Sequence, residues 1–137
     1  MNEDEPKKLW NGTKKKAKLD ISIYGRKNAI GIGKDVIRVL GGPSHVCLKI
    51  KEGLGSFMIT PCAEKDTMSF RVPDNIMFDR HVQMKVTSQS FVIGLLAMND
   101  LEFHHTYKIT GVYSEKNNAV VFDMKDIWIY GEEVKEV

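Results

Sequence analysis

Histidine and cysteine are the residues of this chain best suited to holding a metal ion or acting as a nucleophile. The sequence has four histidines and two cysteines. His104 and His105 are adjacent, so on a strand their side chains point to opposite faces and cannot chelate one ion together. His45 and His81 are far from them in sequence. We therefore predict loop or surface histidines and no metal site.

The two cysteines fall within a predicted β-hairpin. Cys47 and Cys62 lie on its outer face as diagonal neighbours rather than direct partners, a poor placement for a disulfide. An intracellular protein keeps its thiols reduced, so free thiols are expected. His45 shares the face of Cys47, which leaves a Cys–His nucleophile open, but a small, half-buried structural cysteine is the favoured interpretation. The opposite, core-facing side is defined by alternating apolar residues, Val46, Leu48 and Ile50 with Phe57, Ile59 and Pro61.

The glycine-rich segment 31–34 does not fit a nucleotide site. Its lysine is followed by Asp35, where a phosphate loop needs serine or threonine to hold magnesium. Val36 stands where a dinucleotide-binding fingerprint needs its third glycine. The chain also lacks the Gly-x-Ser-x-Gly and His-Glu-x-x-His motifs. We predict no catalytic residue and no cofactor, and therefore no enzyme.

Positive charge concentrates near the start of the chain. Residues 1–73 hold 14 Lys/Arg and 8 Asp/Glu, whereas residues 74–137 hold 6 and 10. Clustered Lys and Arg release counterions from nucleic-acid phosphates, so a one-sided basic surface is predicted to bind DNA. The lysine run alone also fits a solvated, disordered tail. The predicted DNA-contacting residues are Lys14, Lys15, Lys16, Lys18, Arg26, Lys27, Lys34 and Arg38.

The acidic second half supports a different hypothesis. Its excess of carboxylates fits a protein-interaction module, antitoxin-like or accessory, that binds a basic protein partner and no nucleic acid. Trp128 and Tyr130 alternate with Ile127 and Ile129 in a predicted final edge strand. Aromatic side chains there either mark a partner surface or cover the core.

The order of the predicted elements repeats along the chain. A strand, a helix and a hairpin follow one another in the first half, and again in the second half around the N-cap candidate Ser88. Neither unit buries enough apolar surface alone, so the two are predicted to share one core. The predicted segments are a flexible basic arm 1–18, a first unit 19–66, a linker 67–81, a second unit 82–130 and an acidic tail 131–137. The predicted core contains Ile30, Ile32, Val36, Leu40, Leu48, Ile59, Val92, Leu96, Ile109 and Val121.

Residues 20–62 carry a combination of patterns found in one family. The apolar strand 30–32, the helix 34–38 ending at Leu40-Gly41 and the following hairpin resemble the AbrB/MazE/MraZ group of swapped-hairpin proteins. In that group two such units, from two chains or in tandem, interlock into one double-split β-barrel. The resemblance implies a mainly β fold with short helices (α+β), in which two tandem strand–helix–hairpin units surround a pseudo-twofold axis.

The same resemblance implies a function. Proteins of this group are DNA-binding transcriptional regulators or antitoxins, and basic side chains of their strand turn and helix contact DNA. These contacts carry over to Arg38 and, more loosely, to Lys34. The second unit has the sequence Ser-Gln-Ser-Phe over residues 88–91, where basic helix residues would stand, so DNA contact is assigned to the first unit.

Length and composition exclude several classes of protein. A chain of 137 residues forms one domain, and an apolar fraction of 42% is too high for a disordered protein. The longest apolar run, 91–98, is less than half of a membrane span. The charged residues 3–8 do not fit a signal peptide. We expect a cytoplasmic protein, a monomer or homodimer, with no membrane partner.

Overall fold

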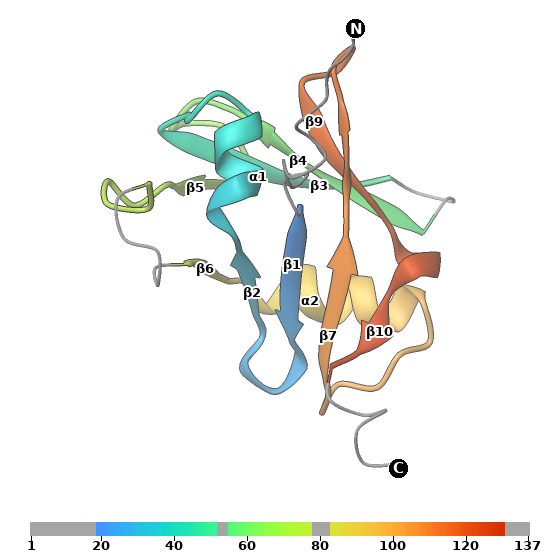
Figure 1. The fold of residues 1–137 in the computed structure, drawn as a ribbon. Coiled ribbons are helices and arrows are strands. Elements are labelled where there is room, and N and C mark those ends of the chain that lie inside the picture. The colour runs from blue at the N-terminus through green and yellow to red at the C-terminus, as the bar shows by residue number, and fades with distance from the viewer. Residues whose placement is uncertain (1–18, 52–54, 78–82, 131–137) are drawn as a thin grey trace, which may run out of the picture.

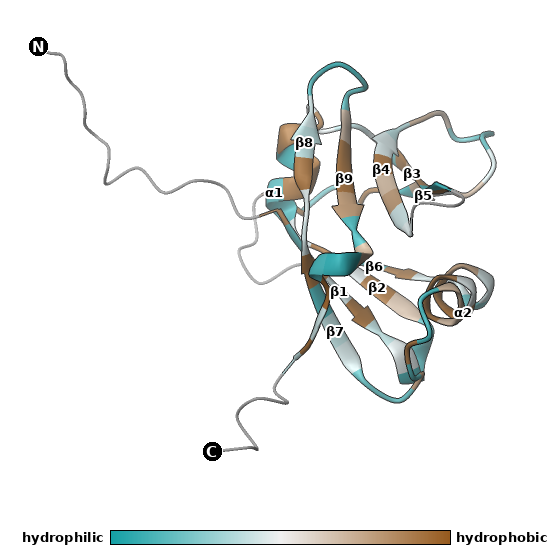
Figure 2. Cartoon of the chain, turned by 90° about the vertical axis from the view of Figure 1, so that its right-hand side faces the viewer, coloured by the Kyte–Doolittle hydropathy of each residue, from teal (hydrophilic) through white to brown (hydrophobic). Residues whose placement is uncertain are grey.

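The computed structural model describes residues 19–51, 55–77 and 83–130, which build two antiparallel sheets of five strands each (Figure 1). The predicted arm 1–18, with its four predicted DNA-contacting lysines, and the acidic tail 131–137 lie outside the described residues. The two sheets face each other across the apolar residues between them (Figure 2). The mainly β class predicted from the sequence is confirmed.

The first sheet, called sheet A, has the strand order β10-β7-β1-β2-β6. Its members are β1 (Asp20–Tyr24), β2 (Ala29–Ile32), β6 (Met84–Thr87), β7 (Thr106–Thr110) and β10 (Trp128–Ile129). The 3-10 turn η1 (Gly25–Lys27) closes the β1–β2 hairpin, and Asn28 leaves it with a positive φ of 53°, which asparagine tolerates well. The position of β10 at the edge confirms the predicted final edge strand.

The second sheet, called sheet B, has the strand order β5-β3-β4-β9-β8. Its members are β3 (His45–Lys51), β4 (Ser56–Pro61), β5 (Ser69–Arg71), β8 (Val112–Ser114) and β9 (Ala119–Asp123). Leu48 pairs with Ile59, which confirms the predicted hairpin register. Within the predicted linker 67–81, β5 pairs with β3, and Val72 and Ile76 are buried.

One bent strand connects the two sheets. β7 lies in sheet A, β8 lies in sheet B, and only Gly111 separates them. A Cβ at Gly111 would lie 2.6 Å from the ring of Phe122, so the bend requires glycine. The Gly111 N–H donates to the Leu19 carbonyl at 2.8 Å, which ties the bend to the chain just before β1.

The two helices differ in length and in the number of side chains that they bury. α1 (Lys34–Val39) follows β2 directly and buries two side chains, whereas α2 (Gln89–Met98) packs beside β2 and η1 and buries four. The Ser88 hydroxyl accepts a hydrogen bond from the Phe91 N–H, which confirms the predicted N-cap. The Phe91 ring contacts the Phe57 ring edge-on, with centroids 5.6 Å apart. This contact links α2 to sheet B. None of the helices in the described residues is long and apolar enough to cross a membrane.

A single hydrophobic cluster fills the space between the sheets and contains buried residues of both predicted units. The predicted core is confirmed at nine of its ten positions. Val121 is the exception: it is half-buried on the outer side of β9, beside Met58 and Val112. The Phe122 side chain points into the core instead, and its ring stacks on that of Phe57 with centroids 4.9 Å apart. Successive strand residues face opposite sides, so this choice turns Val121 outward.

Candidate nucleic-acid interface

The predicted DNA-contacting residues within the described part of the chain fall into two separate pairs. Arg26 and Lys27 lie in η1, at one end of the β1–β2 hairpin, while Lys34 and Arg38 lie on α1, beyond its other end (Figure 1). The structure therefore does not bring the four together. Two of them already have partners: the Arg38 guanidinium forms an ion pair with Asp35, and Arg26 Nε donates to the His104 carbonyl at 2.9 Å.

The outer face of sheet A, which points away from the common core, carries three rows of side chains. Two of them form the surface described here, and the third contains Asp20 and Thr110, whose side chains are hydrogen-bonded to each other. Strand pairing fixes these rows, because residues opposite each other on neighbouring strands share a face. The first row runs across all five strands as Trp128, Lys108, Ser22, Gly31 and Lys85. The second row, next to it, is Tyr130, Thr106, Tyr24, Ala29 and Thr87. Together these two rows are called the sheet A face.

Aromatic rings and lysine ammonium groups stand together at both sides of the sheet A face. Lys108 Nζ lies 4.9 Å from the centroid of the Tyr130 ring, and Lys85 Nζ lies 5.2 Å from that of Tyr24. Both distances are within the range of cation–π attraction. Trp128 lies beside Tyr130 with ring centroids 6.2 Å apart. These two aromatic side chains are 43% and 57% exposed, so large π surfaces are open to solvent.

Small residues on β1 and β2 form a floor beside Tyr24 in the middle of the sheet A face. Ser22 and Ala29 are almost completely buried under their larger neighbours. A Cβ at Gly31 would lie 2.5 Å from the Gln83 side chain, so glycine leaves the space that Gln83 occupies. The Tyr24 hydroxyl donates to Gln83 Oε1 at 3.3 Å, which holds that side chain across the floor. Among the described residues of the two rows, none carries a carboxylate.

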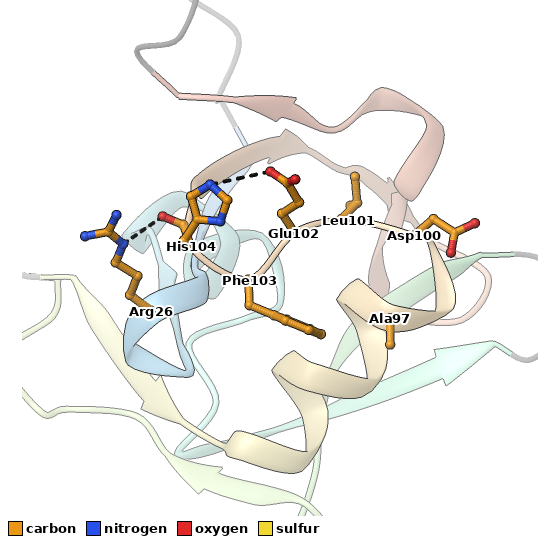
Figure 3. A pocket seen from close by; sticks show the side chains of 7 residues that line it. All are labelled: Arg26, Ala97, Asp100, Leu101, Glu102, Phe103 and His104. Atoms are coloured by element: carbon orange, nitrogen blue, oxygen red, sulfur yellow. Dashed lines mark hydrogen bonds and ion pairs between the residues drawn. The ribbon is translucent and has the colours of Figure 1, made fainter.

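A second group of polar residues lies in the loop between α2 and β7. This loop, residues 99–105, borders an open hollow of about 640 Å³ lined by Arg26, Ala97, Asp100, Leu101, Glu102, Phe103 and His104 (Figure 3). The prediction of loop histidines is confirmed for His104 and His105, and the opposite-face geometry expected on a strand does not apply to them. His104 and His105 lie in a turn rather than on a strand, and their rings stack with centroids 4.1 Å apart. Both rings approach the Glu102 carboxylate.

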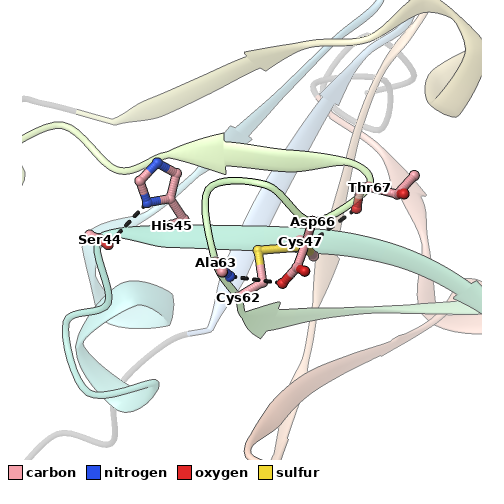
Figure 4. Close-up of a disulfide and its surroundings, with 7 residues drawn as sticks. All are labelled: Ser44, His45, Cys47, Cys62, Ala63, Asp66 and Thr67. Carbon is pink, nitrogen blue, oxygen red and sulfur yellow. Dashed lines mark hydrogen bonds between the residues drawn. A yellow bond between two sulfur atoms is a disulfide. The ribbon is translucent and has the colours of Figure 1, made fainter.

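The cysteine prediction is also corrected by the structure. Cys47 and Cys62 are diagonal neighbours, as expected, but they are joined in a disulfide with Cα atoms 5.9 Å apart (Figure 4). The backbone explains the pairing: β4 ends at Pro61, and the Cys62 N–H still donates to the His45 carbonyl at 3.1 Å, so the chain stays close to β3. His45 bonds to Ser44 instead, and the bonded Cys47 sulfur is no nucleophile.

Sequence reasoning missed both the sheet A face and the 99–105 loop. The sheet A face depends on the pairing of β1 with β7 and of β2 with β6, which are far apart in sequence. The loop had a local signal, because the helix end at Asn99-Asp100 and the strand start at Thr106 leave both histidines in a turn. The chain matches no protein-family model, and no curated protein or solved structure is significantly similar to it.

Proposed function

We propose that this protein binds single-stranded DNA across the sheet A face. The observation that carries the proposal is the pairing of two aromatic rings with lysines, Tyr130 with Lys108 and Tyr24 with Lys85, on two rows without a carboxylate. The Asp20 carboxylate lies in the neighbouring row and accepts a hydrogen bond from Thr110. Proteins that bind single strands combine stacking surfaces for the bases with cations that follow the phosphates. The sheet A face has both stacking rings and cations. Its five strands are separated by four spacings of about 4.8 Å, so the face is about 19 Å wide.

The geometry favours a single strand over a duplex. Stacking on aromatic side chains requires unstacked bases, which a B-form duplex does not offer. Reading the major groove takes a helix or ribbon that projects into it. The sheet A face is a strand surface, and the basic helix α1 has six residues, with its arginine already paired to Asp35.

The basic residues predicted from the sequence keep a supporting role in this proposal. Lys27 is exposed at the end of the β1–β2 hairpin, next to the sheet A face. The arm lysines Lys14 to Lys18 precede β1 directly in sequence and would add sequence-independent phosphate contacts. Such a protein would act as a DNA-binding regulator, the role that the swapped-hairpin resemblance implies.

We also infer a tandem duplication of the strand–helix–hairpin unit. Two pairings support it: β2 and β6, the strands that lead into the two helices, run antiparallel side by side. β4 and β9, the last strands of the two hairpins, do the same in sheet B. A pseudo-twofold axis between the units would require such antiparallel pairs of equivalent strands.

The proposal is tested by titrating a fluorescent oligo-deoxythymidine with the full chain at two salt concentrations. We expect salt-sensitive binding that Lys85→Ala with Lys108→Ala weakens, the salt slope falling by about one per contact removed. Lys49→Ala with Lys51→Ala is the matched control. It removes the same charge from exposed positions on sheet B and should change affinity much less. Equal losses for the two pairs, or no binding at low salt, would contradict the proposal.

A protein partner is the second candidate function. The outer side of sheet B has an apolar row of Met58, Val121 and Val112, and Val112 is 71% exposed on the edge strand β8. An open edge strand can pair with an extended segment of another protein. Two results would favour this interpretation. Oligonucleotides would fail to bind, and a peptide library would yield ligands whose binding is lost in the Val112→Lys variant.

A further inference from the structure

We propose that Glu102, His104 and His105 form a binding site for a divalent first-row transition ion of the zinc class. His104 Nε2 lies 3.4 Å from Glu102 Oε1, and His105 Nε2 lies 3.0 Å from the same oxygen. The three ligand atoms all lie within 4.8 Å of one another. Two imidazoles and one carboxylate are a donor set that suits zinc and its neighbours better than magnesium or calcium.

The two nitrogen–oxygen separations can be compared with those between ligands of one ion. Zinc binds imidazole nitrogen and carboxylate oxygen at about 2.0–2.2 Å. Ligands at those distances are about 3.4 Å apart in a tetrahedron and about 3.0 Å apart at right angles. The two nitrogen–oxygen separations lie in this range, and in the absence of an ion the shorter one is a hydrogen bond between His105 and Glu102. An ion would replace that hydrogen bond and require the side chains to turn toward it.

The backbone of the loop is fixed at each of the three ligand residues. The Tyr107 hydroxyl donates to the Glu102 carbonyl at 2.7 Å. Arg26 Nε donates to the His104 carbonyl at 2.9 Å, and the Gly25 N–H donates to the His105 carbonyl at 3.0 Å. A backbone that is held before the ion arrives loses little conformational entropy on binding, which raises affinity. The Glu102 and His104 side chains themselves are exposed and would be ordered by the ion.

Gly25 permits this arrangement through its missing side chain. A Cβ at this position would lie 2.3 Å from the Phe103 carbonyl oxygen and 2.9 Å from that of His105. Both clashes are with backbone atoms, which cannot rotate away as a flexible side chain can. The β1–β2 turn and the 99–105 loop therefore fit together only with glycine at this point. The Arg26 guanidinium extends to the side of His104 that faces away from Glu102 (Figure 3).

The site is accessible to an ion and leaves room for further ligands. Glu102 and His104 are exposed, while His105 is partly covered and makes an edge contact with the Tyr107 ring at 5.9 Å. Three protein ligands leave coordination positions for water or for a small anionic ligand. Glu102 and His104 also line the open hollow, which gives such a ligand space beside the ion.

The test is calorimetric titration of the untagged, chelator-treated full chain with zinc chloride. We expect one zinc per chain, and no binding of magnesium or calcium under the same conditions. Glu102→Gln keeps the shape of the side chain, and His104→Ala removes an exposed ring. Each should weaken zinc affinity at least about tenfold. Cobalt should bind to the wild type with a visible absorption band that both variants lose.

His45→Ala is the matched control, because His45 lies on β3 in sheet B, bonded to Ser44 and remote from the loop. Its zinc affinity should equal that of the wild type. A dissociation constant weaker than about 1 mM would overturn the proposal, since solvent-exposed histidines reach that range unaided. Equal zinc affinity in the wild type and both ligand variants would overturn it as well.

Discussion

The outer faces of the two sheets differ in chemistry although the sheets are built alike. Each sheet has five antiparallel strands and turns one face to the same core. Sheet A exposes aromatic rings paired with lysines over a floor of small residues. Sheet B exposes Val112 and the lysines Lys49 and Lys51, and its disulfide is largely buried. Both sheets contribute to the common core, so we expect a difference in binding between them to come from the outward positions.

The largest effect on stability is expected from substitutions in the core that the two sheets share. Leu96→Ala in α2 or Leu40→Ala after α1 should each lower the free energy of unfolding by about 2–5 kcal/mol, because both side chains are buried in the common cluster. Denaturant unfolding followed by both tryptophan fluorescence and circular dichroism should give one coincident transition. Two separate transitions would show that the sheets fold independently.

Removing the disulfide should weaken sheet B and leave the proposed binding by sheet A intact. The bond closes a loop with a sequence separation of 15 residues. Loop-closure entropy for that length is about 3 kcal/mol, so Cys47→Ala with Cys62→Ala should lower stability by about that amount. The wild type in a reducing agent is the control, because reduction breaks the bond but leaves both sulfur atoms in place and creates no cavity. Oligonucleotide affinity that fell in step with stability would argue against separate roles for the two faces.

The aromatic side chains of sheet A should contribute to binding rather than to folding. Trp128→Ala and Tyr130→Ala should each reduce oligonucleotide binding by about 1–3 kcal/mol, the range for one stacked base. A Trp10→Phe background leaves Trp128 as the single tryptophan, so its fluorescence quenching reports contact directly. Phe103→Ala removes an exposed ring from the 99–105 loop and serves as the control. A similar loss in that control would remove the distinction between the surfaces.

The smallest expected effect is the change in stability when Tyr107, on strand β7 of sheet A, is replaced. Burial raises the pKa of its hydroxyl above 10.0, and the nearby Glu102 carboxylate raises it further. The folded state therefore holds the hydroxyl proton more tightly than the unfolded state does. The contribution of this hydroxyl to the free energy of unfolding is complete below pH 10 and is lost as the pH rises beyond it. Tyr107→Phe should cost about 1 kcal/mol at neutral pH, because the bond to the Glu102 carbonyl is lost. It should also flatten the alkaline part of a stability–pH curve. An unchanged alkaline slope would assign that slope to other groups.

Local patterns in the sequence predicted much of the fold. The alternation in the β3–β4 hairpin gave the correct register, and the helix cap at Ser88 was correct. Val121 was assigned to the core wrongly because Val120 and Val121 are both apolar, and hydrophobicity alone cannot tell which one faces inward. The phenylalanine at the next position decides the direction, since its ring stacks on Phe57.

Non-local geometry limited the prediction of the candidate sites. The sheet A face arises only when β7, β10 and β6 join the β1–β2 hairpin, and periodicity does not give strand order. Arg26 and Arg38 are close in sequence, yet the length of β2 keeps them apart. His104 and His105 were predicted in a loop, but the sequence did not show that this turn lets their neighbouring side chains converge.

The pairing of β1 with β7 has a consequence for the synthesis of the chain. The Thr110 hydroxyl bonds to the Asp20 carboxylate across a sequence separation of 90 residues. At a translation rate of about 5–20 residues per second, β1 leaves the ribosome about 5–18 s before β7 follows. During that interval Ile21 and Ile23 have no partner strand on one side, and the edge of β1 is open to other nascent chains. Slow codons between β2 and β7 should therefore lower the soluble yield, and a chaperone that covers β-strand edges should restore it.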